Sequence, residues 1–263
     1  MYTRCPKCGH APLPPDQALP AACPACGVIL AKVRSTPGRP PIGRTRPGRR
    51  NRTASTPGQP DDTPTAVWTG LLCWVPERVD TTRWWMRVAL LTAFGLWGLW
   101  LLTRDVRTGA IGQSFIHGPL LVFHEAGHVL FSVFGEWMMF MGGTLGQLLM
   151  PALLAGALLI KNRDPYGAAI GLWLFGVSLL DVAPYVYDAR QPQLMLLSGA
   201  TGEAGGHDWI YLLSSVGLLH RSQGLGQFVH LLGAAVVLLA LAWAAWVLRL
   251  QHARRAGDVF AEE

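Results

Sequence analysis

Long apolar segments are the feature that most constrains the fold of this 263-residue chain. About 20 apolar residues in a row are what an α-helix needs to cross the hydrocarbon core of a bilayer. Charged residues make up only 14% of the chain, against roughly 25% in soluble globular proteins. Five candidate spans follow Val67, at residues 84–102, 111–134, 142–160, 166–182 and 228–248. We therefore predict an all-α polytopic membrane protein with five or six transmembrane helices.

The sixth helix depends on residues 209–219, which are apolar but too short to cross alone. This stretch is expected to be re-entrant, interfacial or part of a longer helix. GxxxG spacings at Gly142/Gly146 and Gly167/Gly171 predict that the third and fourth segments pack backbone to backbone. Arginines in the C-terminal region favour a cytosolic C-terminus, which suits an even number of crossings better than five.

Composition divides the chain into residues 1–33, 34–66 and 67–263. The first 66 residues carry ten Lys/Arg and three Asp/Glu, whereas the rest carries twelve and thirteen. Residues 34–66 are rich in Pro, Gly and Arg with almost no apolar side chain, so they are predicted to be a disordered linker. A basic N-terminal region favours the cytosol. We expect an integral membrane protein, of the bacterial inner-membrane kind, with a cytosolic N-terminus and membrane lipid around residues 67–263.

Two CxxC pairs separated by fourteen residues stand in residues 1–33. This spacing is typical of a zinc ribbon, in which four thiolates close a tetrahedral structural site. The four ligands would be Cys5, Cys8, Cys23 and Cys26. Gly9 and Gly27 follow the pairs and can adopt the positive φ that such turns use. A redox pair and two disulfides are the alternatives. A protein partner is expected for the ribbon, and nucleic acid is disfavoured because no aromatic residues accompany the linker's arginines.

The segment FHEAGHVLF, residues 123–131, places three polar side chains in an apolar run. His124 and His128 are four residues apart, so they lie on one face of a helix with ring nitrogens able to meet at one ion. Glu125 can then act as the general base on a metal-bound water, as in other HExxH sites. The alternative is a set of polar residues that face a cavity in a helix bundle without metal. Intramembrane ionisable residues indicate function in either case.

A hydrolytic zinc site needs a third protein ligand and an open position for water. Asp181, at the end of the fourth segment and three residues before Pro184, is the first candidate. His207 and Asp208 in "GGHDW" are the alternatives. Two further polar residues can face the site. His117 lies two turns before His124, although Gly118 and Pro119 follow it, and Gln147 lies within the third segment.

The chain resembles the site-2 protease group of intramembrane zinc metalloproteases. The resemblance rests on HEAGH in a predicted membrane helix, then a glycine-rich helix, then an aspartate at the end of a later helix, over residues 111–210. It implies His124 and His128 as zinc ligands, Glu125 as catalytic base and Asp181 as third ligand. The Asp-Gly pair usual in that group is absent, because Val182 follows Asp181.

These observations predict a membrane-embedded zinc metalloprotease that hydrolyses peptide bonds of a membrane-protein substrate. It would hold one structural zinc in the ribbon and one catalytic zinc in the membrane domain. Two other functions remain open from the sequence. One is a non-catalytic metal-binding or sensor protein that uses the same histidines. The other is a membrane anchor whose zinc ribbon binds a partner.

Overall fold

The computed structural model describes residues 3–5, 10, 11, 13, 21–25, 27, 29, 30, 64–77, 79–197 and 199–261. The chain forms two compact units, Met1–Gly58 and Gln59–Glu263. The division falls inside the segment predicted as a linker.

In the first unit, Cys5 and Cys23 are both buried. Gly27 has a φ of 70°, which confirms the left-handed conformation predicted for the glycine after the second CxxC pair. The other two predicted ligands, Cys8 and Cys26, lie outside the described residues. The zinc ribbon therefore stays a prediction.

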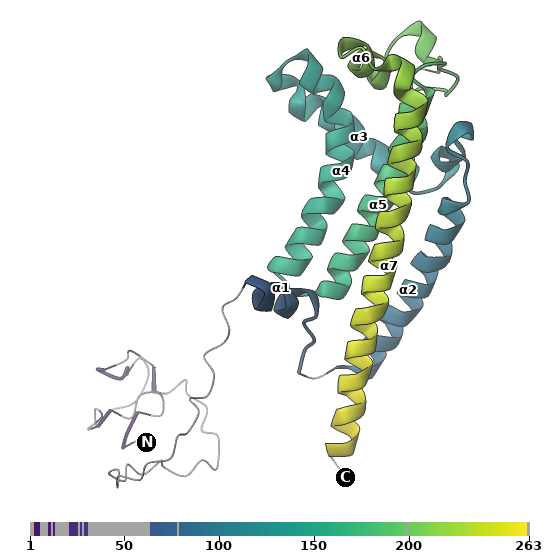
Figure 1. The fold of residues 1–263 in the computed structure, drawn as a ribbon. Helices are drawn as coiled ribbons and strands as arrows, with labels where there is room; N and C mark the ends of the chain where they lie inside the picture. The colour runs from purple at the N-terminus through teal and green to yellow at the C-terminus, as the bar shows by residue number, and fades with distance from the viewer. Residues whose placement is uncertain are drawn as a thin grey trace, which may run out of the picture. The chain divides into compact units, whose positions relative to one another are not determined.

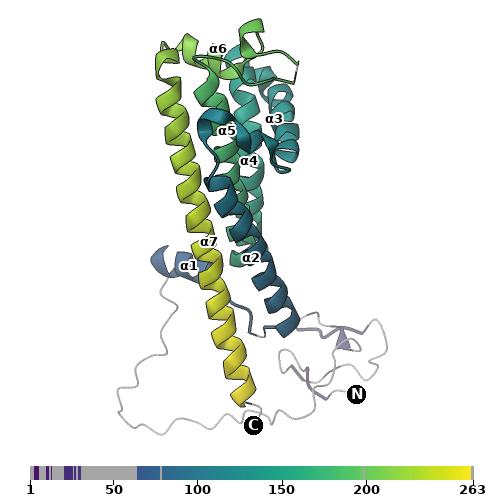
Figure 2. The ribbon, with the colours of Figure 1, turned by 90° about the vertical axis from the view of Figure 1, so that its right-hand side faces the viewer.

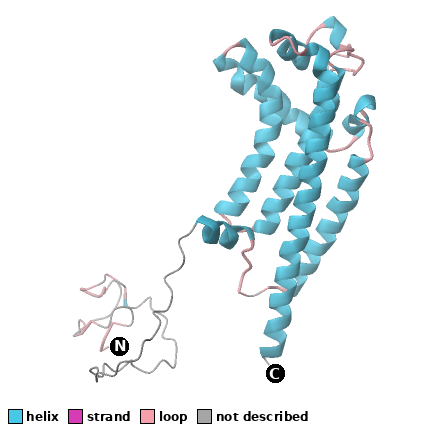
Figure 3. Ribbon diagram, viewed as in Figure 1, coloured by secondary structure: helices cyan, strands magenta, loops and turns pink. Residues whose placement is uncertain are grey.

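The described part of the second unit is built from helices and contains no β-strand (Figure 3). Within it, four helices are long and apolar enough to cross a membrane. They are α2 (Thr81–Leu102), α4 (Glu136–Ile160), α5 (Pro165–Asp188) and α7 (Ser222–Ala261). They confirm four of the five predicted segments and indicate an integral membrane protein. A shorter helix, α1 (Pro64–Leu72), precedes them and begins inside the predicted linker.

The segment predicted to cross the membrane at residues 111–134 does not form a spanning helix. Its first residues lie in short 3-10 turns, and α3 (His117–Phe131) begins only at His117. Pro119 lacks an N–H and lies in the first turn of α3, where no backbone hydrogen bond is lost. α3 has 15 residues, about 22 Å at 1.5 Å per residue, against roughly 30 Å of hydrocarbon. The prediction of five or six spans is therefore corrected to four among the described residues.

Residues 209–219 likewise do not cross. They form α6 (Asp208–Ser215), a helix of eight residues, followed by a turn into η6 (Leu219–Arg221). The chain runs along the bundle in α2, back in α4, along it again in α5 and back in α7 (Figures 1 and 2). An even number of crossings results, as the C-terminal arginines suggested.

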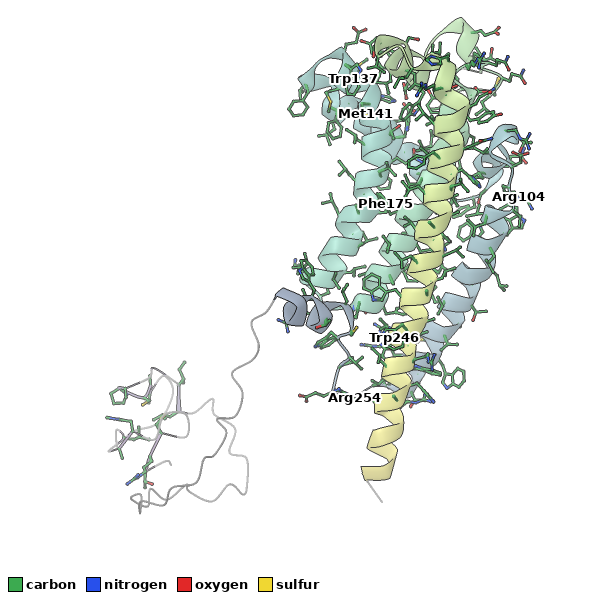
Figure 4. All side chains as sticks on the ribbon, in the orientation of Figure 1. Arg104, Trp137, Met141, Phe175, Trp246 and Arg254 are labelled. Carbon is green, nitrogen blue, oxygen red and sulfur yellow. The ribbon has the colours of Figure 1, made fainter. Side chains whose placement is uncertain are left out.

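The two ends of the bundle differ in what they carry. The α1 end holds α1, the start of α2 and the C-terminal part of α7, and the α6 end holds α3, α6 and the adjoining loops (Figure 1). Figure 4 places Arg254 and Trp246 toward the α1 end, with Trp137 and Arg104 toward the α6 end. The polar motif of α3 therefore lies near one end of the bundle.

α5 is the central helix, packed against both α4 and α7. Its side chains Trp173, Val177 and Leu180 are fully buried in one apolar cluster with Leu101 of α2 and Val237 of α7. These contacts hold α5 in the middle of the helix bundle.

α3 packs on α4 through glycines. A Cβ at Gly142 would lie 2.6 Å from the carbonyl oxygen of Gly127, and one at Gly146 would lie 2.5 Å from the carbonyl oxygen of Phe123. Gly171 of α5 in turn lies against Ala155 of α4. The GxxxG prediction is confirmed for Gly171, whereas Gly142 and Gly146 pack against α3 and not against α5.

Replacement of Gly142 by alanine should separate α3 from α4, because the added methyl group meets backbone that cannot move aside. Over-packing of this kind costs about 1–3 kcal/mol. We expect a lower midpoint of thermal unfolding in detergent, followed by tryptophan fluorescence. Gly156→Ala is the matched control in the same helix, since nothing lies within 4 Å of its Cβ position. Equal midpoints for the two variants would contradict close packing at Gly142.

Candidate metal centre

Three side chains converge at the α6 end. His124 Nε2 lies 3.0 Å from Asp208 Oδ2, and His128 Nε2 lies 3.3 Å from the same oxygen. One ligand atom from each residue lies within 4.8 Å of the other two. Zinc–nitrogen and zinc–oxygen bonds of about 2.0–2.2 Å in a tetrahedron separate ligand atoms by roughly 3.3 Å. The described cluster therefore has the size and the ligand types of a zinc site.

α3 presents the two histidines because it has two different faces. His124 is buried, and His128 is partly buried on the same face. The opposite face is apolar and exposed, with Val122, Val129 and Leu130 each about two-thirds or more accessible. In a membrane protein such a face lies against lipid, and the polar face turns toward the other helices.

Both imidazoles use Nδ1 for hydrogen bonds to the protein. His128 Nδ1 donates to the carbonyl oxygen of Met139 at 2.8 Å, and His124 Nδ1 lies 3.2 Å from Gln147 Oε1. These bonds fix the ring orientation and leave Nε2 of each ring for a metal, as is usual for metal-binding histidines. The structure thus confirms that Gln147 faces the site.

A backbone hydrogen bond and a glycine turn fix the position of Asp208. Its N–H donates to the hydroxyl oxygen of Tyr185 at 2.9 Å. Gly205 and Gly206 have φ values of 103° and 82°, a turn that glycine adopts with little strain. This turn brings the first residue of α6 over the histidines of α3. The short sequence "GGHDW" therefore positions a carboxylate from a distant part of the chain.

Asp181, the first candidate for third ligand, lies elsewhere. Its Oδ1 is 2.9 Å from His117 Nδ1, and its Oδ2 accepts from Gln147 Nε2 at 2.8 Å. Gln147 thus stands between this carboxylate and His124. α5 continues through Pro184 to Asp188, so the helix does not open beside Asp181 as expected. The structure brings Asp208, one of the two alternatives, to the histidines in its place.

His207, the other alternative, does not join the cluster. Its ring is buried and stacks on Tyr185, with ring centres 4.1 Å apart. Its Nε2 lies 3.6 Å from a carboxylate oxygen of Asp188. His207 therefore supports the segment that carries Asp208 and does not contribute a ligand atom.

Gly143 is a site residue that the sequence did not reveal. A Cβ there would lie 2.5 Å from His124 Nε2 and 2.6 Å from His128 Nε2. The backbone of α4 therefore lies directly against the two rings, and a side chain would occupy the space of the ion. Only its membership of a glycine-rich run could have marked it.

A cavity of about 810 Å³ adjoins the cluster. Glu125, which is exposed, lines it together with the three cluster residues. Residues of α3 and α5 line it, as do residues 194–197 and 204–206. The cluster and the carboxylate of Glu125 therefore line one cavity.

Asp208 also sets the charge of the site. Its hydrogen bond raises the pKa of His128 to about 9. Burial alone would raise the pKa of Asp208, but hydrogen bonds from His124 and His128 outweigh burial, so its pKa lies below the usual value. His128 therefore carries a proton near neutral pH that a divalent cation would displace, because metal ligands bind in their deprotonated forms.

No family model, curated protein or solved structure matches the chain. The likeness to site-2 proteases therefore stays a resemblance carried by HEAGH, and the ligand assignment rests on the geometry described above.

Asp208→Asn should remove the zinc of the membrane domain, because an amide is a poor substitute for a charged ligand. Asp181→Asn should retain it, since Asp181 lies outside the cluster. The measurement is zinc per chain by mass spectrometry, in full-length protein whose four N-terminal cysteines are serines. Loss of zinc in Asp181→Asn with full occupancy in Asp208→Asn would reverse the assignment.

Proposed function

We propose that this chain is a membrane-embedded zinc metallopeptidase. The observation that supports it is the convergence of His124, His128 and Asp208 beside a large cavity that Glu125 also lines. Two histidines and one carboxylate, with a position left open, form the ligand set of catalytic zinc sites. A structural site would be closed by a fourth protein ligand, and none is present among the described groups.

A bound zinc ion would polarise the scissile carbonyl and lower the pKa of a water molecule. Glu125 then removes a proton from that water as its oxygen attacks the carbonyl carbon. The carboxyl group holds the proton and passes it to the amide nitrogen as the carbon–nitrogen bond breaks. Gln147 and the carbonyl of Met139 keep the two imidazoles in place throughout.

Glu125→Gln should lower kcat by about 10²- to 10⁴-fold, the usual contribution of a positioned general base. The zinc content should be unchanged, because Glu125 is not one of the three clustered residues. The assay is cleavage of a model transmembrane substrate in detergent or liposomes. Glu136→Gln is the control, since this carboxylate lies at the start of α4 and does not line the cavity. Full cleavage by Glu125→Gln would contradict the role of Glu125 as general base, and no cleavage by wild type with zinc retained would leave a non-catalytic metal protein.

We further propose that the cavity opens on the side away from the cytosol. Four crossings place both α1 and the C-terminal part of α7 at the same end (Figure 1). That end carries seven described basic residues, namely Arg83, Arg87, Lys161, Arg163, Arg249, Arg254 and Arg255. The α6 end carries four, Arg104, Arg107, Arg190 and Arg221. Basic residues accumulate on the cytosolic side, which favours the α1 end as cytosolic.

Labelling of single cysteines tests this orientation. In full-length protein whose native cysteines are serines, a membrane-impermeant maleimide should label Glu203→Cys in intact cells. Asn162→Cys, in the loop between α4 and α5, should be labelled only after lysis. The opposite pattern would place the cavity on the cytosolic side.

A further inference from the structure

His117 is a polar residue of the cavity that the proposed chemistry does not use. It is the first residue of α3 and lines the same cavity as the metal cluster. Its side chain is 36% exposed, whereas that of its partner Asp181 is 4% exposed. A buried carboxylate therefore holds an imidazole that remains accessible from the cavity.

The carboxylate of Asp181 serves two groups at once. Its Oδ1 lies 2.9 Å from His117 Nδ1, and its Oδ2 accepts from Gln147 Nε2. Gln147 in turn orients His124. An isolated buried carboxylate is costly, and here both oxygens are paired. Asp181 therefore orients His117 directly, and through Gln147 it also fixes the ring of His124, a proposed metal ligand.

The orientation leaves one ring atom for a ligand. Since Nδ1 of His117 faces Asp181, Nε2 is the nitrogen that remains. The hydrogen bond to Asp181 raises the pKa of His117. The carboxylate oxygen of Asp181, 2.9 Å from Nδ1, stabilises the imidazolium form of His117, in which Nε2 also carries a proton and donates. A protonated Nε2 that faces the cavity can donate to a backbone carbonyl oxygen of a bound peptide.

The spacing between His117 and the cluster sets how far along a bound peptide His117 would lie from the scissile bond. Seven residues separate His117 from His124, about 10.5 Å along a helix at 1.5 Å per residue. An extended peptide rises about 3.3 Å per residue. A peptide that lies along α3 with its scissile carbonyl at the metal would therefore reach His117 about three residues away.

We propose that His117 binds a backbone carbonyl of the substrate about three residues from the scissile bond. The substrate class is then a peptide segment extended over at least that length, and shorter or helical segments bind poorly. This inference rests on the proposed peptidase activity and adds the substrate conformation that the cavity selects. Asp181 acts through His117 and Gln147 as a positioning residue.

The test compares His117→Ala and His117→Gln with wild type in the full-length holoenzyme. Each is given model peptides with four or more residues on both sides of the scissile bond. Each is also given matched peptides cut to two residues on one side or the other. For the long peptides, His117→Ala should lower kcat/KM about tenfold, mainly through KM, with zinc content unchanged. His117→Gln should restore part of the loss, because its amide can donate.

For peptides shortened on the side that faces His117, His117→Ala and wild type should have similar kcat/KM. His220→Ala, an exposed histidine outside the cavity, should resemble wild type with every peptide. An equal loss with long and short peptides, or a loss of zinc in both His117 variants, would overturn the inference while leaving the peptidase in place. Absence of cleavage in wild type, or cleavage that survives Glu125→Gln, would overturn the peptidase and the inference together.

Discussion

The close contact between α3 and α4 is the constraint on which the rest of the site depends. Gly127 on one helix and Gly142 and Gly146 on the other remove the side chains that would hold the backbones apart. At this separation the carbonyl of Met139 reaches His128 and the amide of Gln147 reaches His124. Helix packing in an apolar solvent depends on such small residues because lipid and apolar side chains attract a helix equally. The same glycines therefore stabilise the helix pair and set the geometry of the rings.

Polar groups inside an apolar bundle are tolerated here because they form a connected network. A chain of hydrogen bonds runs from His117 to Asp181, then to Gln147 and on to His124. Asp208 contacts both histidines of the cluster. Each would be costly alone. A cation bound at Nε2 of both rings would leave their Nδ1 hydrogen bonds to Gln147 and Met139 intact.

The sequence predicted the parts of the molecule that depend on local pattern. Apolar runs located four helices long enough to span, and the spacing of His124 and His128 placed two histidines of the candidate cluster on one face. The third residue of the candidate cluster was harder to predict, because its place depends on where α6 folds relative to α3. Asp181 had the expected place in the chain, but its carboxylate is engaged by His117 and Gln147. Asp208 reaches the rings through a glycine turn whose direction no periodicity reports.

The short length of α3 connects the fold to the chemistry. Hydropathy alone could not reveal it, since residues 111–134 are apolar enough to cross, and only Gly118 and Pro119 in the sequence made a continuous helix doubtful. A full-length crossing helix could have placed His124 and His128 deep in hydrocarbon, far from water. A helix of 15 residues at the α6 end instead keeps the cluster beside a cavity formed with loops at that end. The proposed hydrolysis would consume water, and a site near the end of the bundle meets this requirement without the separate channel that a mid-membrane site would need.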